Sequence, residues 1–410
     1  MVGAAVKITW QQALAWRMKR HMLEPLGDSS ATEVVARLCG VQAQVASSAE
    51  LAVRLRQVES NRSEVSEAIA IGRLIKTWAM RGTLHLLPAE DAGNYLSLMA
   101  AGRTWERPSW QRYFGVTPAV WEALRPAVRE VLDGKVLTRE ELIAALTARP
   151  GFGHLGEALR SGWGTLLKPL AWQGDLCFGP SRGSSVTFAR PEDVGIGWKG
   201  VPDPALSAPV VITAYLAAYG PASAQSFNNW MARGWLGKRL TDGWFAETRN
   251  QLADVEVDGE RAYVLAQDLD ELASTRPSTA VRLLGGFDQW ILGPGTDDGH
   301  VTPVSRRWEV SKQSGWISPV VIVGGVVAGT WDLRGDSLTI RWFSESGPPP
   351  AAALADEVER LGRILGRPLI PRVEALRIQR PGIIDPHSGT DLTINACLLT
   401  TWMPTRHHRD

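Results

Sequence analysis

The sequence repeats one pattern three times: a run of helical segments that ends in a β-hairpin. The hairpins are expected near residues 80, 180 and 258, and Asp258-Gly259 in the last of them is a strong signal for a two-residue turn. Blocks of about 80 to 100 residues with the same order of elements indicate tandem modules. Helices followed by a hairpin make the winged-helix pattern, in which one helix enters a DNA groove and the hairpin contacts the backbone.

The chain changes character at Val281, where short strand patterns broken by glycines replace the helical ones. These strands predict a small antiparallel sheet or barrel. A helix is expected over residues 351–365, directly after three prolines. The sequence therefore divides into four expected domains, which span residues 1–112, 113–204, 205–278 and 279–410.

A short connector, Val41 to Val45, carries two glutamines between two expected helices. One capping box, Ser30 to Glu33, starts the helix before it, and a second, Ser47 to Glu50, is expected to start the helix after it. An extended connector places Gln42 and Gln44 on one face. Both amides then lie beside a helix N-terminus, where free N–H groups and a partial positive charge favour phosphate.

Charge gives a regional argument for nucleic acid and no global one. The formal net charge of the 410 residues is +1, which does not by itself indicate a polyanionic partner. Residues 1–112 hold 14 Lys plus Arg against 10 Asp plus Glu, hence +4. This modest basic bias suits either a DNA-facing surface or an ordinary mixed-charge one.

Several classes of protein are disfavoured by what the sequence lacks. Cys39, Cys177 and Cys397 lie far apart, so neither a disulfide framework nor a thiolate zinc site is expected. The seven histidines show no metal-binding spacing, and we expect no metal and no cofactor. The longest apolar run is too short for a bilayer, and residues 1–10 lack a signal-peptide core. We therefore expect no membrane partner and a cytoplasmic location.

Two motifs resemble catalytic signatures in the wrong setting. Gly151 to Gly156 matches the dinucleotide-binding pattern, but an expected helix rather than a strand precedes it. Gly179 to Gly183 matches Gly-x-Ser-x-Gly, yet a second strand follows, which makes it a hairpin tip. Asp288, after two glycines, is expected to satisfy backbone donors rather than to act as an acid or base.

Three segments together resemble one bacterial family: Gln42-Ala43-Gln44, the hairpin Trp78 to Leu87, and Leu283 to Asp288. They resemble the winged-helix DNA glycosylases that unhook interstrand crosslinks, the AlkZ-like family, in an order that covers nearly the whole chain. The resemblance implies an α+β fold of three tandem winged-helix modules followed by a small antiparallel β-barrel. It places the family's Gln-x-Gln motif on Gln42 and Gln44, and glutamine rather than aspartate at the second position favours the self-resistance branch.

The chemistry of alkylated purines makes two glutamines a sufficient catalytic set. An N7- or N3-alkylated purine already carries a positive charge, so it leaves as a neutral base without a general acid. The enzyme then has only to hold a water against the sugar, which the amide oxygens of Gln42 and Gln44 can do. We expect His85 or Thr83 on the hairpin to help position the water or the lesion strand. In a second interpretation the glutamines and His85 only bond neighbouring groups.

The expected partner is double-stranded DNA that carries alkyl adducts or crosslinks, bound by a monomer associated with the bacterial nucleoid. Two alternatives remain open: a non-catalytic winged-helix protein, acting as a regulator or a lesion-sequestering factor, and a nuclease. The nuclease is disfavoured because no carboxylate cluster for metal ions is evident. The basic residues expected to hold phosphates are Arg54, Arg56, Lys76, Arg81, Lys238 and Arg239.

Overall fold

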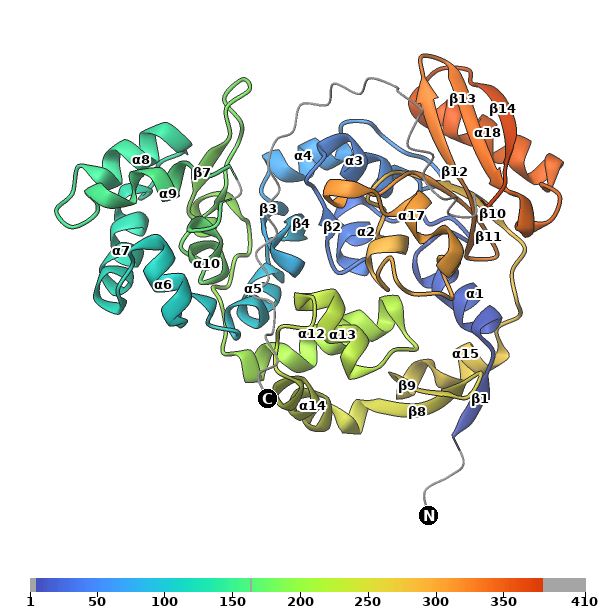
Figure 1. Cartoon of the computed structure of the whole chain (residues 1–410), viewed down its shortest axis with the longest axis horizontal. Helices are drawn as coiled ribbons and strands as arrows, with labels where there is room; N and C mark the ends of the chain where they lie inside the picture. The colour runs from blue at the N-terminus through green and yellow to red at the C-terminus, as the bar shows by residue number, and fades with distance from the viewer. Residues whose placement is uncertain (1–4, 163, 379–410) are drawn as a thin grey trace, which may run out of the picture.

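The computed structural model describes residues 5–162 and 164–378, and its fold class is α+β, as expected. Four parts of the chain, called units here, lie in different places in Figure 1. The first lies in the centre, the second forms a lobe at the left, the third lies at the bottom, and the C-terminal sheet lies at the upper right. Helices of the first unit are α2 (Ala31–Arg37), α3 (Ala46–Arg54) and α4 (Glu64–Ala70), and its hairpin is β3 (Leu74–Trp78) and β4 (Leu84–Pro88).

One six-stranded sheet runs through the first and second units in the order β2-β4-β3-β6-β7-β5. The first hairpin lies inside this sheet, with the glutamine strand on one side and the second hairpin on the other. The join between the units is narrow, because β3 meets β6 through the single pair Lys76 and Phe178. The remaining strands are β2 (Val41–Gln42), β5 (Leu137–Thr138), β6 (Cys177–Phe178) and β7 (Thr187–Ala189).

The second unit contains the expected hairpin, and the helical segment before it is broken into two helices. The break lies at Gly164, whose φ of +62° is strained for other residues and where a Cβ would come within 2.3 Å of the Trp78 ring. The helices between residues 92 and 194 are α5 (Ala92–Ala100), α6 (Pro108–Phe114), α7 (Pro118–Val131), α8 (Arg139–Thr147), α9 (Gly156–Arg160), α10 (Leu167–Trp172) and α11 (Pro191–Val194).

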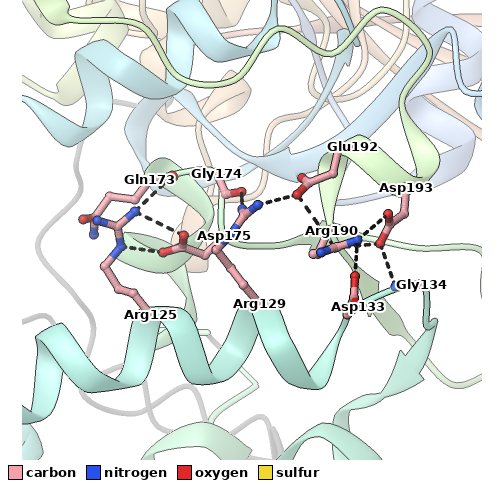
Figure 2. Close-up of polar contacts among 10 residues, drawn as sticks. All are labelled: Arg125, Arg129, Asp133, Gly134, Gln173, Gly174, Asp175, Arg190, Glu192 and Asp193. Atoms are coloured by element: carbon pink, nitrogen blue, oxygen red, sulfur yellow. Dashed lines mark hydrogen bonds and ion pairs between the residues drawn. The ribbon is translucent and has the colours of Figure 1, made fainter.

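A polar network attaches α7 to the segments that flank the second hairpin (Figure 2). Arg125 Nε donates to Asp175 Oδ2 at 2.7 Å, and the Asp175 carboxylate is almost fully buried. Arg129 donates to the Gly174 carbonyl at 3.1 Å and pairs with Glu192 of α11. Because the Arg125–Asp175 pair is bidentate and its carboxylate is buried, it fixes the segment before the hairpin more firmly than a surface pair would.

The third unit ends in the expected two-residue turn. Asp258 and Gly259 have φ of +47° and +90°, the combination that a type I′ turn requires. The strand β1 (Val6–Ile8) pairs parallel with β8, so this strand belongs to the sheet of the third unit and not to the first unit. The elements concerned are α1 (Trp10–Arg20), α12 (Pro204–Tyr219), α13 (Ala224–Ala232), α14 (Lys238–Glu247), β8 (Leu252–Val257), β9 (Glu260–Leu265) and α15 (Leu269–Ser274).

The expectation of a β-barrel is wrong for the described residues: the C-terminal strands form an open five-stranded sheet in the order β10-β11-β12-β13-β14. The last pair, β13 and β14, is parallel because α18 carries the chain back across one face before β14 begins. The elements are β10 (Val281–Leu284), α16 (Gln289–Leu292), α17 (Arg307–Val310), β11 (Val320–Val323), β12 (Val326–Arg334), β13 (Ser337–Phe343), α18 (Ala351–Leu365) and β14 (Ile370–Leu376).

A buried ion pair joins the first unit to the C-terminal sheet. Arg56, which follows α3, donates from Nη2 and Nη1 to the two Asp288 oxygens at 2.7 and 2.9 Å, and both side chains are fully buried. Asp288 also accepts from the Trp290 backbone N–H at 2.8 Å, as its place after two glycines predicted. The pair therefore fixes α3, and the connector before it, against β10.

We expect the substitution Asp288→Asn to lower the free energy of unfolding by about 3 to 5 kcal/mol, because it leaves the Arg56 charge buried without its counter-ion. Urea denaturation followed by circular dichroism measures this loss. The matched control is Asp254→Asn, which breaks the solvent-exposed Arg249–Asp254 pair and is expected to cost less than about 1 kcal/mol. Equal losses in the two variants would contradict the role given to the buried pair.

Candidate active site and nucleic-acid interface

The glutamine connector is the outer strand of the central sheet. Val41 and Gln42 pair with β4, opposite Leu86 and His85, and the Ala43 N–H continues the pairing to the Leu84 carbonyl at 2.7 Å. Val41 and Ala43 belong to the buried cluster beneath α2 to α4. Gln42 therefore faces the opposite side of the sheet.

The two glutamines differ in their access to solvent. Gln42 is only 7 % exposed, whereas Gln44 is exposed. The connector thus carries one buried amide, that of Gln42, and one solvent-exposed amide, that of Gln44.

The second capping box does not form, and α3 begins two residues earlier than this box predicted. Val45 is the N-cap and makes no side-chain cap hydrogen bond. Its apolar side chain packs instead against the cluster that contains Phe287 and Ile317, which fixes the start of the helix. The first turn of α3, directly after Gln44, therefore carries no side-chain cap on its N–H groups.

A row of polar side chains crosses three strands beside Gln42. Gln42 lies opposite His85, and His85 lies opposite Thr77, so the three side chains share one face at about 4.5 to 5.5 Å between Cβ atoms. His85 and Thr77 are fully buried. Among the described residues, neither His85 Nε2 nor Thr77 Oγ1 has a hydrogen-bond partner. Such atoms are uncommon in folded proteins and mark a place where water or a ligand group belongs.

His85 is a neutral side chain in this row. Its Nδ1 lies 3.0 Å from the Thr83 carbonyl, which can only accept, so Nδ1 carries the proton and Nε2 is a free acceptor. Burial, reinforced by the nearby Arg81 charge, lowers the pKa of His85 to about 3. The hydroxyl of Thr83 donates to the Met80 carbonyl at 3.1 Å, within the hairpin turn. The interpretation that His85 only bonds a neighbouring backbone group thus explains Nδ1, whereas Nε2 remains available to accept a hydrogen bond.

Arg54 and Arg56, expected to hold phosphates, are buried in the structure. Arg56 is engaged by Asp288 and by the Ala52 carbonyl at 2.6 Å. Arg54 is 6 % exposed and donates to the Ile364 carbonyl and to Glu50. Their guanidinium groups hold α3 against the C-terminal unit. The expectation that Arg54 and Arg56 bind DNA phosphates is therefore corrected, because neither guanidinium group is on the surface.

The other four basic candidates have different surroundings. Arg81, with φ of +58°, donates to the Trp230 and Leu292 carbonyls at 3.0 and 3.2 Å and so anchors the hairpin turn to α13 and α16. Lys76 and Thr77 are neighbours in β3, so their side chains point to opposite faces of the sheet, and the Lys76 amine lies over the Phe178 ring. The exposed candidates are Lys238, which pairs with Asp242, and Arg239, both at the start of α14.

Two basic residues that the sequence did not single out approach the hairpin turn. Lys168 of α10 reaches Gly82, and Arg233 follows α13. Each stands alone in the sequence, in a different block, so no motif or spacing could have joined them. Only the packing of the three units around the hairpin brings these charges together.

Two further features of the described residues bear on the expected chemistry. No group of three His, Cys, Asp or Glu side chains there could hold a metal ion. Cys39 and Cys177 are free and buried, and burial raises the pKa of Cys39 to about 12; Cys397 lies outside the described residues. In the same part of the chain, no helix combines the length and apolarity that a bilayer crossing needs.

The low pKa of His85 predicts that the protein loses stability as the pH falls. In the unfolded chain His85 binds a proton near pH 6.5, whereas in the folded chain it does so only near pH 3. The stability that the neutral His85 contributes to the fold is therefore complete above pH 6.5 and declines below it. At pH 5 the loss from this group is about 2 kcal/mol. Urea denaturation at pH 7 and pH 5 measures it.

The control for this effect is His85→Gln, whose stability is expected to fall less between the two pH values. His21, also buried with a pKa lowered well below the usual value, contributes in the same direction and remains in both proteins. Identical pH dependence in the wild type and the variant would contradict the burial of a neutral His85.

Comparison with known proteins places the chain in a family. Residues 35–364 match the family described as DNA glycosylase AlkZ-like. The chain is 47% identical over 367 residues to an "Interstrand DNA cross-link repair glycosylase" of Streptomyces sahachiroi, an alignment that covers 89% of this chain and 99% of that protein. The solved structure of Streptomyces sahachiroi DNA glycosylase AlkZ superposes with a TM-score of 0.87 over 90% of this chain and 100% of that one. This chain therefore belongs to the AlkZ-like family of DNA glycosylases.

Proposed function

We propose that this chain is a monofunctional DNA glycosylase that hydrolyses the N-glycosidic bond of bulky N7- or N3-alkylpurines and unhooks interstrand crosslinks, as self-resistance to a genotoxic natural product. The observation that carries the proposal is the pair of glutamines at the end of β2. Gln44 is exposed, and Gln42 is buried beside polar atoms that have no partner among the described residues. The printed name of the Streptomyces relative, an interstrand DNA cross-link repair glycosylase, supports the same substrate class.

In the proposed reaction the two amide oxygens hold the attacking water. Gln44 meets the DNA at the surface, and Gln42 accepts a second hydrogen bond from the same water. As the water oxygen bonds to C1′, the glycosidic bond breaks and its electron pair neutralises the charge of the alkylated purine, while the proton of the water passes to solvent. The site therefore needs no strong acid, and a neutral His85 fits it. We assign to His85 Nε2 and Thr77 Oγ1 the orientation of Gln42, and to Thr83 the shape of the turn beside Gln44.

We further propose that the three units ending in hairpins act as winged helices around the duplex, with limits near residues 112, 204 and 278. The protein would act as a monomer on nucleoid DNA in the cytoplasm. Lys238 and Arg239 are candidates for phosphate contacts because both are exposed. Lys76 is a weaker candidate, since it is partly buried and burial lowers its pKa.

The substitutions Gln42→Ala and Gln44→Ala are each expected to slow base release by about 100-fold or more, because a misplaced water loses the alignment on which the reaction depends. The measurement is the yield of alkali-labile abasic sites in a duplex with one bulky N7-alkylguanine. Gln225→Ala, which removes an exposed glutamine of α13, is the control and should retain activity. Tight binding without base release on every adduct would favour the non-catalytic alternative.

Base release is expected to proceed unchanged in excess EDTA, and strands are expected to remain intact until alkali is added. The reason is that the proposed reaction uses a water held by amides and breaks only the glycosidic bond. Denaturing gel electrophoresis before and after alkali separates the two products. Strand cleavage that EDTA abolishes would indicate the nuclease alternative instead.

A further inference from the structure

Three cations from three different units meet at the turn of the first hairpin. Arg81 lies in the turn itself, Lys168 projects from α10 of the second unit, and Arg233 lies at the end of α13 in the third. The Lys168 Nζ would be 3.8 Å from a Cβ built on Gly82. Arg233 is close enough to both other residues for its charge to lower the pKa of each.

Within the part of the chain that the structure describes, this cluster has no counter-ion. In residues 5–162 and 164–378, none of the three cations forms an ion pair with an Asp or a Glu, and no carboxylate is among the causes that shift the pKa of Lys168 or Arg81. Burial first, and then Arg233, lower the pKa of Lys168 to about 8. Arg81 Nη2 is buried without a partner among the described residues, although Nη1 is used twice.

Lys168 and Arg81 are partly withdrawn from water, whereas Arg233 is exposed. Like charges near partly buried groups repel one another more strongly than fully exposed charges do. The cost is normally offset by a carboxylate, as it is for Arg56 and Arg125 elsewhere in this chain. Where no carboxylate is present, an external anion can supply the compensation. An uncompensated cluster of this kind is therefore the electrostatic footprint of an anion site.

The cluster adjoins the glutamine connector. The connector runs antiparallel to β4, and the Ala43 N–H still bonds the Leu84 carbonyl, so the next residue, Gln44, lies alongside Thr83, one position from Gly82. A DNA strand whose lesion faces Gln44 would bring a backbone phosphate to the hairpin turn. The uncapped first turn of α3 adds partial positive charge on the other side of Gln44.

We propose that Lys168 and Arg233 form a clamp for one backbone phosphate of the lesion strand, supported by Arg81. This inference rests on the proposed function for its ligand, DNA, and adds the residues that hold the strand beside Gln44. The clamp is assembled only when the three units pack on the hairpin. Because the clamp contacts a backbone phosphate and no base, it binds undamaged and damaged duplexes alike.

The test is duplex binding as a function of salt concentration, by fluorescence anisotropy, for the wild type and the variants Lys168→Met and Arg233→Ala. Loss of one phosphate contact is expected to reduce the slope of log K against log salt by about one. Lys168→Arg should keep the wild-type slope. The control Lys7→Ala removes a lysine that is 82% exposed on β1 and should change nothing.

Thermal unfolding without DNA separates a clamp from a merely structural role. Because Lys168→Met removes a half-buried repulsive charge, the variant is expected to melt at a higher temperature than the wild type while it binds DNA more weakly. A lower melting temperature together with an unchanged salt slope would overturn the proposal. Unchanged salt slopes in both Lys168→Met and Arg233→Ala would overturn it as well.

A lysine with a lowered pKa can also act as an amine nucleophile on the aldehyde of an abasic site. Treatment of the wild type and abasic DNA with borohydride distinguishes this role. A trapped covalent complex that is lost in Lys168→Arg would overturn the phosphate clamp in favour of a nucleophilic lysine. The binding test uses undamaged duplex as well as adduct duplex. The clamp can therefore hold even if base release fails, and base release can succeed even if the clamp fails.

Discussion

Backbone pairing along the β3–β4 hairpin is the constraint on which the other units depend. A strand in the interior must satisfy its N–H and C=O groups on both sides, and the hairpin does so with β2 on one edge and β6 on the other. Its turn is held by Arg81, which donates to carbonyls of α13 and α16. All four units therefore contact this one hairpin, and Gln42 takes its place opposite His85 through the same ladder.

Desolvation decides what the groups around the hairpin can do. It keeps His85 neutral, so the site can orient water or an amide but cannot offer an imidazolium proton. A site of this kind suits a leaving group that already carries a positive charge. The same desolvation acts on Lys168 and Arg81, where repulsion between like charges adds to it. The strands of the hairpin thus carry a neutral polar row, and its turn carries a cationic cluster.

Basic residues illustrate how a charge in the sequence can have opposite roles. Arg54 and Arg56 lie in a basic stretch next to a candidate site, yet their guanidinium groups are buried against carbonyls and carboxylates of the C-terminal unit. Lys168, in an unremarkable stretch, reaches the turn that carries Arg81. Whether an arginine or lysine faces DNA depends on which distant segment covers it, and local spacing does not contain that information.

Local rules determined much of this protein directly. The hairpins, the capping box before α2, the turn at Asp258-Gly259 and the alternation around Gln42 follow from hydrogen bonding and sterics between near neighbours. Tertiary structure decided the rest: the open sheet instead of a barrel, the pairing of β1 with β8, and the start of α3 at Ala46. It also decided the burial of Arg56 and the meeting of Lys168 with Arg233. These features depend on contacts between residues far apart in the chain, where desolvation and packing outweigh local preference.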